Sequence, residues 1–462
     1  MSLTKLPTEV LTSIFQFTAP PPVPFPLEDD LPRPTRPFLY PTTLGAVALL
    51  WREVVWSTPS LWTSFCCPMS MWQREDRDSP STLLLLHLQN SKTLPLQLAF
   101  SWDEMHEDEM TLFSPIVDPI LIASFPRIKT LTLQRPLAKA WFNHLGNLSG
   151  VVQLTIEWII PDITPLDLTQ CHSLHHINLN GWLFHTHKLP RSLTSLHLKR
   201  IPIDACIELF LQHPSSLVEI SLSSSINPFY YRHEFLQLPR PPVVFERLEV
   251  LSWEIGREDW DDYFLKHAHT PALRRLRVVN PHIIPVYRQR ERHEGECLFL
   301  KRLPSTLSTL ELHRVEGTDW PSYSSLFESN LMVEHLVLVN CNLDVIVDLI
   351  NRLTPPENAT SASWFLPRLR SISIDGYFKC GDIGIVEPTE AVHRFEHPHS
   401  DSLVSMLQKR LTKNDTFHIE VKGITVDWTD EMKAMLQRIA GQGVLLEIFE
   451  GSKPVEWLKR TQ

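Results

Sequence analysis

Glycine is scarce in this sequence, with 14 residues among 462, whereas proline is abundant with 38. Phosphate-binding loops depend on glycine, because its backbone can turn tightly and approach a phosphate group closely. None of the patterns G-x-S-x-G, G-x-x-x-x-G-K-S/T and G-x-G-x-x-G occurs in the chain. The sequence therefore predicts neither a nucleotide-binding loop nor the nucleophile elbow of a hydrolase.

Cysteine is also sparse, and the seven residues include no C-x-x-C pair. Their odd number and irregular spacing are typical of buried thiols in a reducing compartment. No signal-type apolar segment begins the chain, and no run of about 18 apolar residues occurs. We therefore expect a protein of the cytoplasm, the nucleus or both, without a membrane partner.

The chain has no excess of basic residues: 43 lysines and arginines against 53 acidic residues leave a net charge of −10. Proteins that bind nucleic acid gain affinity from excess positive charge, so we expect no nucleic-acid partner. The basic run at residues 288–292 is short and flanked by acids, which makes it weak evidence for such a partner.

Two clusters of residue types that bind metals lack the spacing of a metal site. The acidic run at residues 103–109 has neither the Asp/Asn spacing nor the glycine of a calcium loop, and we interpret it as a solvated loop or helix. A cluster of five histidines between residues 172 and 187 contains no H-E-x-x-H pattern, and we interpret these residues as ordinary surface histidines. The sequence thus predicts no metal, no cofactor and no catalytic activity. The clustered histidines are His172, His175, His176, His185 and His187.

The chain does contain two amphipathic patterns in its first 62 residues. One helical pattern follows Leu6 and Pro7 directly, with Glu9 in its first turn, where a carboxylate suits the helix dipole. About forty residues of this kind are too few for an independent core, so their apolar surface must meet the rest of the chain or another protein. The apolar residues at helical spacing are Val10, Leu11, Ile14 and Phe15, and in a second helix Leu44, Val47, Leu50, Trp51, Val54 and Val55.

The two patterns together resemble the F-box. Residues 6–15 match the family's opening LPxE-(V/L)-L-x-x-IF, and residues 47–54 match its V-x-x-x-W-R-x-V helix. The tail WSTPSLW at residues 56–62 is similar to the version common in mushroom-type fungi. The resemblance covers residues 3–65. The proline-rich insertion at residues 20–41 is longer than the family's usual linker, and we expect it to loop out, because proline there continues neither helix.

The resemblance implies that this module docks on the Skp-type adaptor of an SCF, a cullin–RING ubiquitin ligase. The partners that it implies are therefore the adaptor and, through it, the cullin. The residues implied in adaptor binding are Leu6, Pro7, Glu9, Val10, Leu11, Ile14, Phe15, Val47, Leu50, Trp51 and Val54.

The second strong pattern is internal repetition. From residue 128 onward the phrase apolar-x-x-apolar-x-apolar returns ten times, and some intervening segments, such as 204–213 and 343–353, look helical. The phrases resemble irregular leucine-rich repeats, and the best match runs from Val333 to Leu343, with Cys341 at the Asn/Cys position. Two or three copies would be a common pattern in a leucine-rich chain, but ten are hard to dismiss. The central apolar residues are Leu131, Leu154, Ile177, Leu196, Ile220, Leu251, Leu276, Leu310, Leu336 and Ile372.

We therefore predict an α/β fold: a small N-terminal F-box helical module followed by a curved leucine-rich-repeat solenoid with a parallel sheet. The predicted parts are the module at residues 3–65, a bridging segment at 66–127, irregular repeats at 128–400 and a C-terminal cap at 401–462. The bridging segment reads as a helix followed by a strand that starts the sheet. The cap reads as two helices around a strand.

The residues between the inward leucines project from the open face of the predicted sheet. They are polar and of mixed charge, and the face is either merely solvated or a protein-binding surface, as in other solenoids. Arg275, Arg277 and Glu311 are the charged residues of first interest. Trp158 and Trp182, just past two strands, either anchor a partner or pack under the next loop. The predicted substrate-binding residues are His176, Asn178, His197, Glu254, Arg275, Arg277, Glu311 and His313.

The preferred function is a substrate-recognition subunit of an SCF-type ubiquitin ligase that binds an unidentified protein substrate. Such a receptor acts by proximity, because it holds the substrate near the ubiquitin thioester and supplies no catalytic side chain. The alternative is a leucine-rich scaffold whose F-box-like start acts outside a ubiquitin ligase. An enzyme with a dispersed active site has no supporting motif.

Overall fold

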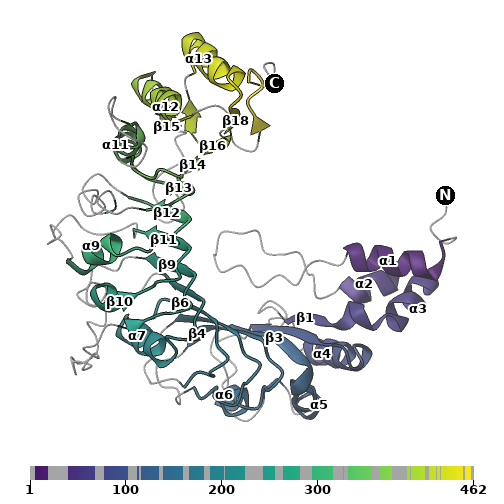
Figure 1. Ribbon diagram of the computed structural model, residues 1–462. Coiled ribbons are helices and arrows are strands. Elements are labelled where there is room, and N and C mark those ends of the chain that lie inside the picture. Colours follow the sequence, from purple (N-terminus) through teal and green to yellow (C-terminus); the bar gives the residue numbers. More distant parts are fainter. Residues whose placement is uncertain are drawn as a thin grey trace, which may run out of the picture. The chain divides into compact units, whose positions relative to one another are not determined.

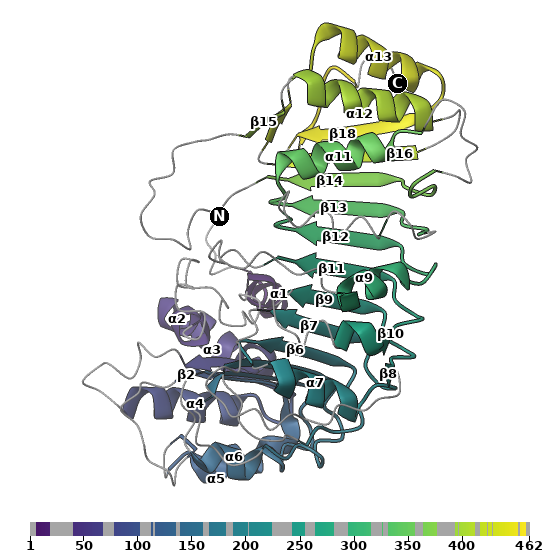
Figure 2. The same ribbon diagram turned by 90° about the vertical axis from the view of Figure 1, so that its left-hand side faces the viewer.

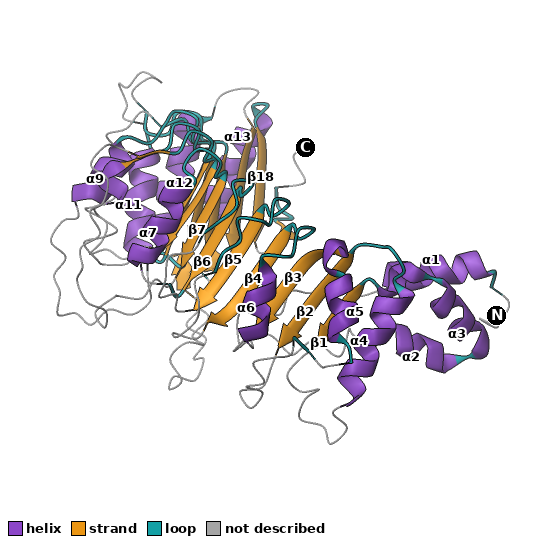
Figure 3. Ribbon diagram, turned by 90° about the horizontal axis from the view of Figure 1, so that it is seen from below, coloured by secondary structure: helices purple, strands orange, loops and turns teal. Residues whose placement is uncertain are grey.

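The computed structural model forms a mixed α/β structure that is dominated by large, mostly parallel β-sheet (Figures 1 and 3). The chain divides into two compact units, Met1–His213 and Pro214–Gln462, which are described in turn. The structure describes residues 6–18, 40–67, 78–101, 112–113, 116–134, 139–159, 166–181, 188–201, 203–223, 243–254, 264–280, 294–315, 326, 331–355, 364–376, 393–395, 397–411, 416–422, 424–426, 428–450 and 453–458.

The first unit begins with a group of short helices, called here the helical module. The first helix starts after Pro7 as predicted, but the second predicted helix is divided in two at Ala48, whose backbone is extended (φ −156°, ψ 158°). Arg52 stabilises the break, because its Nε donates to the Gly45 carbonyl at the end of the preceding helix, 3.0 Å away. The elements of the module are α1 (Thr8–Thr18), α2 (Tyr40–Val47), α3 (Leu49–Ser57) and the short 3-10 helix η3 (Pro59–Trp62).

The predicted insertion at residues 20–41 is described only at its end. Residues 20–39 lie outside the described part of the chain. Tyr40 and Pro41 form the first turn of α2 instead of belonging to a loop. A proline at the second helical position is compatible with this, since the backbone N–H groups of the first turn have no partner within the helix.

The sheet of the first unit starts one strand earlier than predicted. Strand β1 crosses the predicted boundary between the helical module and the bridging segment at residue 65, and it pairs in parallel with β2. The predicted helix and strand of the bridging segment are confirmed as α4 and β2. The strands follow one another in chain order (Figure 3): β1 (Ser64–Cys67), β2 (Leu96–Ser101), β3 (Ile128–Gln134), β4 (Gln153–Ile159), β5 (His176–Gly181) and β6 (Ser195–Lys199). The connecting helices are α4 (Asp78–Asn90), α5 (Asp118–Ala123), η5 (Phe125–Arg127), α6 (Lys139–Leu145) and, after β6, α7 (Ile203–Gln212).

The second unit has the same architecture. Its strands again lie side by side in chain order, with helices in several of the connections (Figure 2). The parallel strands are β7 (Glu219–Ser223), β9 (Val250–Glu254), β11 (Arg275–Val279), β12 (Thr309–His313), β13 (His335–Val339), β14 (Ser371–Asp375), β16 (Thr416–Lys422) and β18 (Leu445–Glu450). The remaining elements are α9 (Glu294–Lys301), α11 (Leu343–Leu353), α12 (His397–Arg410), α13 (Asp430–Gly441), an antiparallel end strand β19 (Lys453–Pro454), and the two-residue or three-residue pairs β8 (Val243–Val244) with β10 (Ala268–His269) and β15 (His393–Phe395) with β17 (Ile424–Val426).

The predicted repeat register is confirmed. All ten central apolar residues are at most 2% exposed, and each pairs directly with the corresponding residue of the neighbouring strand within its unit. A slip by one residue would turn these side chains to the solvent face, so their burial holds the register. In the first unit the column is Leu98, Leu131, Leu154, Ile177 and Leu196. In the second unit it is Ile220, Leu251, Leu276, Leu310, Leu336, Ile372, Ile419 and Ile448.

The C-terminal segment contains the predicted helices, α12 and α13, around a strand. That strand, β16, pairs with β14 in the same register, and β18 follows it. The parallel sheet therefore continues past residue 400 and ends at the antiparallel β19. The six described cysteines are free thiols. Within the described ranges, no helix has both the length and the apolar character that crossing a membrane requires.

Candidate protein-binding surfaces

The helical module has a small core of its own. Leu11 and Phe15 of α1 pack with Val54 and Val55 of α3, and the Phe15 ring meets the Trp51 ring edge to face at 4.9 Å between centroids. Edge-to-face pairs add to the stabilisation that comes from buried area. The core is thus built from those apolar residues of α1 and α3 that face the inside of the module.

Trp62 joins this core to the rest of the first unit. Its ring is fully buried, its Nε1 donates to the Val55 carbonyl at 2.9 Å, and its ring lies 5.2 Å from that of His87 in α4. The side chain of Leu86 also packs against the same core. The tail WSTPSLW therefore anchors the module to α4 and to the start of the sheet.

The outer half of α1 is apolar and exposed. Val10, Ile14 and Phe17 lie at positions i, i+4 and i+7, which fall on one face of a helix, and Phe17 is 91% exposed. Val47 and Leu49, on either side of the break at Ala48, are 60% and 74% exposed. Exposed apolar side chains gathered on one short module are typical of a surface that meets another protein.

The predicted adaptor-binding residues divide between the surface and the interior. Leu11, Phe15 and Val54 are buried within the module, so the structure assigns them to its core instead of its contact surface. The exposed members are Pro7, Glu9, Val10, Ile14 and Val47, and the half-buried members are Leu6, Leu50 and Trp51.

Two prominent exposed residues are missing from that prediction. Phe17 lies one turn beyond Ile14 and continues its stripe, so helical spacing alone would have found it. Leu49 begins α3, and a prediction of one continuous helix gave no reason to single it out.

The ends of the proline-rich insertion are tied together by Tyr40. Its hydroxyl donates to the Phe15 carbonyl at 2.9 Å and lies 2.5 Å from the Thr18 hydroxyl. The start of α2 is thereby fixed to the end of α1. Gln16 donates across the module to Ser60 of η3 at 2.8 Å, which ties α1 to the tail as well.

On the sheet face of the first unit, the most unusual group is Glu157. Its side chain is buried and accepts a bond from Gln134 Nε2 at 2.7 Å. Burial raises the pKa of Glu157 to about 7, although Gln134, Lys199 and Arg200 act in the opposite direction. The predicted residues of this unit line the same face: His176 is exposed, Asn178 is half-buried, and His197 Nε2 lies 2.9 Å from Ser195 Oγ.

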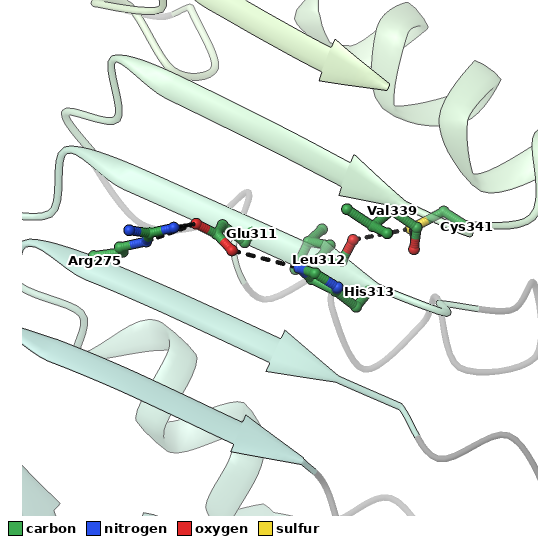
Figure 4. Close-up of polar contacts among 6 residues, drawn as sticks. All are labelled: Arg275, Glu311, Leu312, His313, Val339 and Cys341. Atoms are coloured by element: carbon green, nitrogen blue, oxygen red, sulfur yellow. Dashed lines mark hydrogen bonds and ion pairs between the residues drawn. The ribbon is translucent and has the colours of Figure 1, made fainter. Parts of the chain in front are cut away.

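On the sheet face of the second unit, Glu311 is the centre of a charged network (Figure 4). Arg275 Nη2 lies 2.5 Å and Nε 2.6 Å from Glu311 Oε1, and His313 Nε2 lies 3.4 Å from Oε2. Burial by itself raises the pKa of Glu311, but the bonds from His313 and Arg275 outweigh it, and the net pKa is lowered. The Glu311 side chain is only 7% exposed, so it stabilises the face and is not free to contact a substrate.

The other predicted residues of this unit differ in availability. The Arg277 side chain is exposed and makes no hydrogen bond or ion pair in the described part of the chain. Glu254 is half-buried at the end of β9. The Trp158 side chain and the whole of Trp182 lie outside what the structure describes. Among the predicted residues of this unit, Arg277 and the outer atoms of Arg275 are therefore the most accessible charged groups.

The histidine cluster is described in part, since His185 and His187 lie outside the described residues. His175 Nδ1 lies 2.8 Å from the Ser192 carbonyl, so this side chain bonds to the adjacent loop. Among the residues that the structure describes, no group of three histidine, cysteine or acidic side chains is arranged to hold a metal ion.

No model of a known protein family matches the chain, and no curated protein matches it. Its function is therefore inferred from the sequence patterns and the geometry of these surfaces.

Proposed function

We propose that this chain is the substrate-recognition subunit of an SCF-type cullin–RING ubiquitin ligase. In this proposal the helical module is an F-box that docks on the Skp-type adaptor. The parallel sheet is the body of an irregular leucine-rich-repeat solenoid, and its polar face holds a protein substrate. The chain has no catalytic side chain in this role and acts by raising the local concentration of substrate lysines near the ubiquitin thioester.

The observation that carries the adaptor half of the proposal is the exposed apolar stripe of α1. The module already has a core in Leu11, Phe15 and Trp62, so Val10, Ile14 and Phe17 are not needed to complete it. Their exposure is unfavourable in water and becomes favourable when a partner covers them, since burying one such side chain is worth about 1.5–3 kcal/mol. The stripe lies on the segment that carries the LPxE-V-L-x-x-IF pattern.

The part of the proposal that concerns substrate binding rests on the regular repetition of strands in the sheet. A solenoid presents one side chain per strand in each row of its face, which gives an extended surface without a deep cavity. In the second unit such a row contains Ser252, Arg277 and Glu311 on successive strands. This row offers the hydroxyl of Ser252 and the unpaired cation of Arg277 to a protein partner, while Glu311 stays bonded within the protein.

The direct test is co-purification of the full-length chain with a Skp-type adaptor and its cullin. Ile14→Asp and Phe17→Asp each place a charge on the exposed stripe and should weaken adaptor binding on the order of 10- to 100-fold without unfolding the module. The matched control is Gln16→Glu, which adds the same charge on a different face of α1; its carboxylate can accept a bond from the Ser60 hydroxyl in place of the bond that Gln16 donates to it.

The outcomes separate the two candidate roles. Adaptor and cullin that co-purify with the chain, and are lost together in the stripe variants, support the proposal. Adaptor binding without cullin indicates a scaffold that acts outside a ligase. If wild-type chain and Phe17→Asp retain the adaptor equally, or neither retains it, the F-box assignment is wrong. Proximity labelling with the full chain and with a deletion of residues 1–62 then distinguishes substrates from ligase subunits.

A further inference from the structure

A pocket of about 460 Å³ lies at the edge of the second unit where strands β13, β14 and β16 begin. Glu334 and Arg370 stand directly before β13 and β14, and Arg410 ends α12. Trp364 and Arg368 come from the segment that precedes β14. This volume is in the range of pockets that hold a small molecule.

Arg410 brings a buried positive charge to the pocket. The residue is only 6% exposed, and its Nη1 donates to the carbonyls of Leu353 and Phe365, both at 2.9 Å, while its Nη2 donates to the carbonyl of Leu366. Burial lowers the pKa of Arg410 to about 10, so the guanidinium remains charged at neutral pH. Within the described residues no carboxylate pairs with it, and a buried cation without a counter-charge is unfavourable.

The three carbonyl bonds explain part of the role of Arg410 but not the whole pocket. Leu353 is the last residue of α11, so the bond to its carbonyl closes the end of that helix. These bonds use three of the five N–H donors of the guanidinium. The other two donors have no partner among the described residues.

Trp364 supplies a second donor that has no acceptor. Its ring lies 5.7 Å from the Arg410 guanidinium carbon, and its Nε1 is buried without a hydrogen-bond partner in the described structure. Buried donors are nearly always paired, so an unpaired one at the wall of a pocket indicates a missing acceptor.

The net charge of the pocket is positive, which also favours a hydrogen-bond acceptor as its ligand. Arg368 and Arg370 are exposed, and neither makes an ion pair with a described residue. Together with Arg410 they place three positive charges around one negative charge, that of Glu334. The pocket is therefore cationic on a chain whose net charge is −10.

We infer that this pocket binds a small molecule that carries a phosphate monoester. Arginine forks and an indole N–H are hydrogen-bond donors, and they match the oxygens of a phosphate group. The charge of a phosphate monoester at neutral pH, about −1.5 to −2, is close to the excess charge of the pocket, whereas a carboxylate would neutralise only half of it. The proposal is independent of the role of the helical module, because the pocket lies in the other unit and its test needs no adaptor.

The test is calorimetric titration of the full-length chain with inorganic phosphate, glycerol 3-phosphate, glycerol and a phosphoserine peptide. We expect saturable binding of phosphate and tighter binding of glycerol 3-phosphate, with none for glycerol. Arg368→Gln combined with Arg370→Gln should weaken binding at least on the order of 10-fold. Trp364→Phe keeps a ring but removes the N–H and should weaken binding several-fold. Glu334→Gln removes the opposing charge and should tighten the binding of inorganic phosphate.

Arg438→Gln is the matched control, since it removes one exposed arginine of α13 outside the pocket and should leave the titrations unchanged. Arg368 and Arg370 are exposed, so their replacement should leave the fold intact, which circular dichroism can verify. The inference is overturned if wild-type chain binds neither phosphate nor glycerol 3-phosphate, if the arginine variant binds them equally well, or if only the phosphoserine peptide binds.

Discussion

The carboxylate of Glu311 bonds Arg275 and not Arg277, although Arg277 is the residue directly opposite it in the sheet. Arg275 reaches diagonally from β11 to β12, and His313 lies against the second carboxylate oxygen. Both oxygens of Glu311 are thus engaged within the protein. The network leaves the Arg277 side chain unpaired, so this cation is available to a charged partner.

Replacing Glu311 should therefore affect stability more than recognition. Because its pKa is lowered in the folded protein, its contribution is present above the ordinary value near pH 4.5 and is lost as the pH falls through the lowered pKa. We expect Glu311→Gln to reduce the free energy of unfolding by about 1–2 kcal/mol at pH 7 and to match wild type in strong acid. Urea denaturation at both pH values measures the difference.

The control for this variant is Glu249→Gln. Glu249 pairs with Arg274 at 3.8 Å, but both side chains are largely exposed, and exposed ion pairs contribute little. Its stability should equal that of wild type at each pH. If both variants lost the same free energy of unfolding, the ion pair between Arg275 and Glu311 would contribute no more than an exposed ion pair.

The sheet could be predicted from the sequence because its alternation is a local property. Each buried residue of the central column, such as Leu276 or Leu336, stands in the same short phrase, and strand pairing requires the phrases to align. The start of the sheet was missed because the phrase of β1, Ser64–Cys67, is short and lacks leucine.

The candidate sites depend on tertiary contacts that no local pattern carries. The stripe of α1 contains four adjacent apolar positions, and packing against Val54, Val55 and Trp51 decides that Phe15 turns inward while Ile14 stays outside. The break at Ala48 depends on the bond from Arg52 to Gly45. The cationic pocket draws its arginines from segments some forty residues apart, so their convergence follows from the stacking of strands and leaves no motif.

Glu157 should make the first unit less stable as the pH rises. Its pKa is raised to about 7 in the folded protein, so between about pH 4.5 and pH 7 the folded state holds a proton that the unfolded state has lost. The free energy of unfolding should fall across this window by at most about 3 kcal/mol and then level off. Glu157→Gln should remove this dependence and exceed wild type in stability at pH 8. Urea denaturation at pH 5 and pH 8 tests this. The control is Glu53→Gln, which replaces an exposed carboxylate of α3 and should change neither the stability at pH 8 nor its dependence on pH.

Cys341 should be unreactive until the second unit opens. Its thiol is buried and donates to the Leu312 carbonyl of the neighbouring strand at 3.2 Å (Figure 4). Burial raises the pKa of Cys341 to about 11, although nearby backbone bonds act in the opposite direction, so little thiolate forms at pH 8. Iodoacetamide followed by peptide mass spectrometry should label the half-buried Cys297 before Cys341. Labelling of Cys341 at the same rate in native buffer would show that β12 and β13 separate readily.

The insertion between α1 and α2 should be dispensable for adaptor binding as long as Tyr40 is present. The Tyr40 hydroxyl bonds the Phe15 carbonyl and lies against Thr18, so a linker of about six residues, which can span up to about 20 Å, is long enough to replace residues 20–38. We expect this shortened chain to bind the Skp-type adaptor as wild type does. Tyr40→Phe removes both bonds and should lower the free energy of unfolding of the module by about 1–2 kcal/mol. If the two changes are coupled, this loss should be larger in the shortened chain than in the full-length chain. Pull-down with the adaptor and urea denaturation of all four chains measure this. If the shortened chain with Tyr40 intact loses the adaptor while α1 to α3 remain folded, the insertion itself contributes to docking.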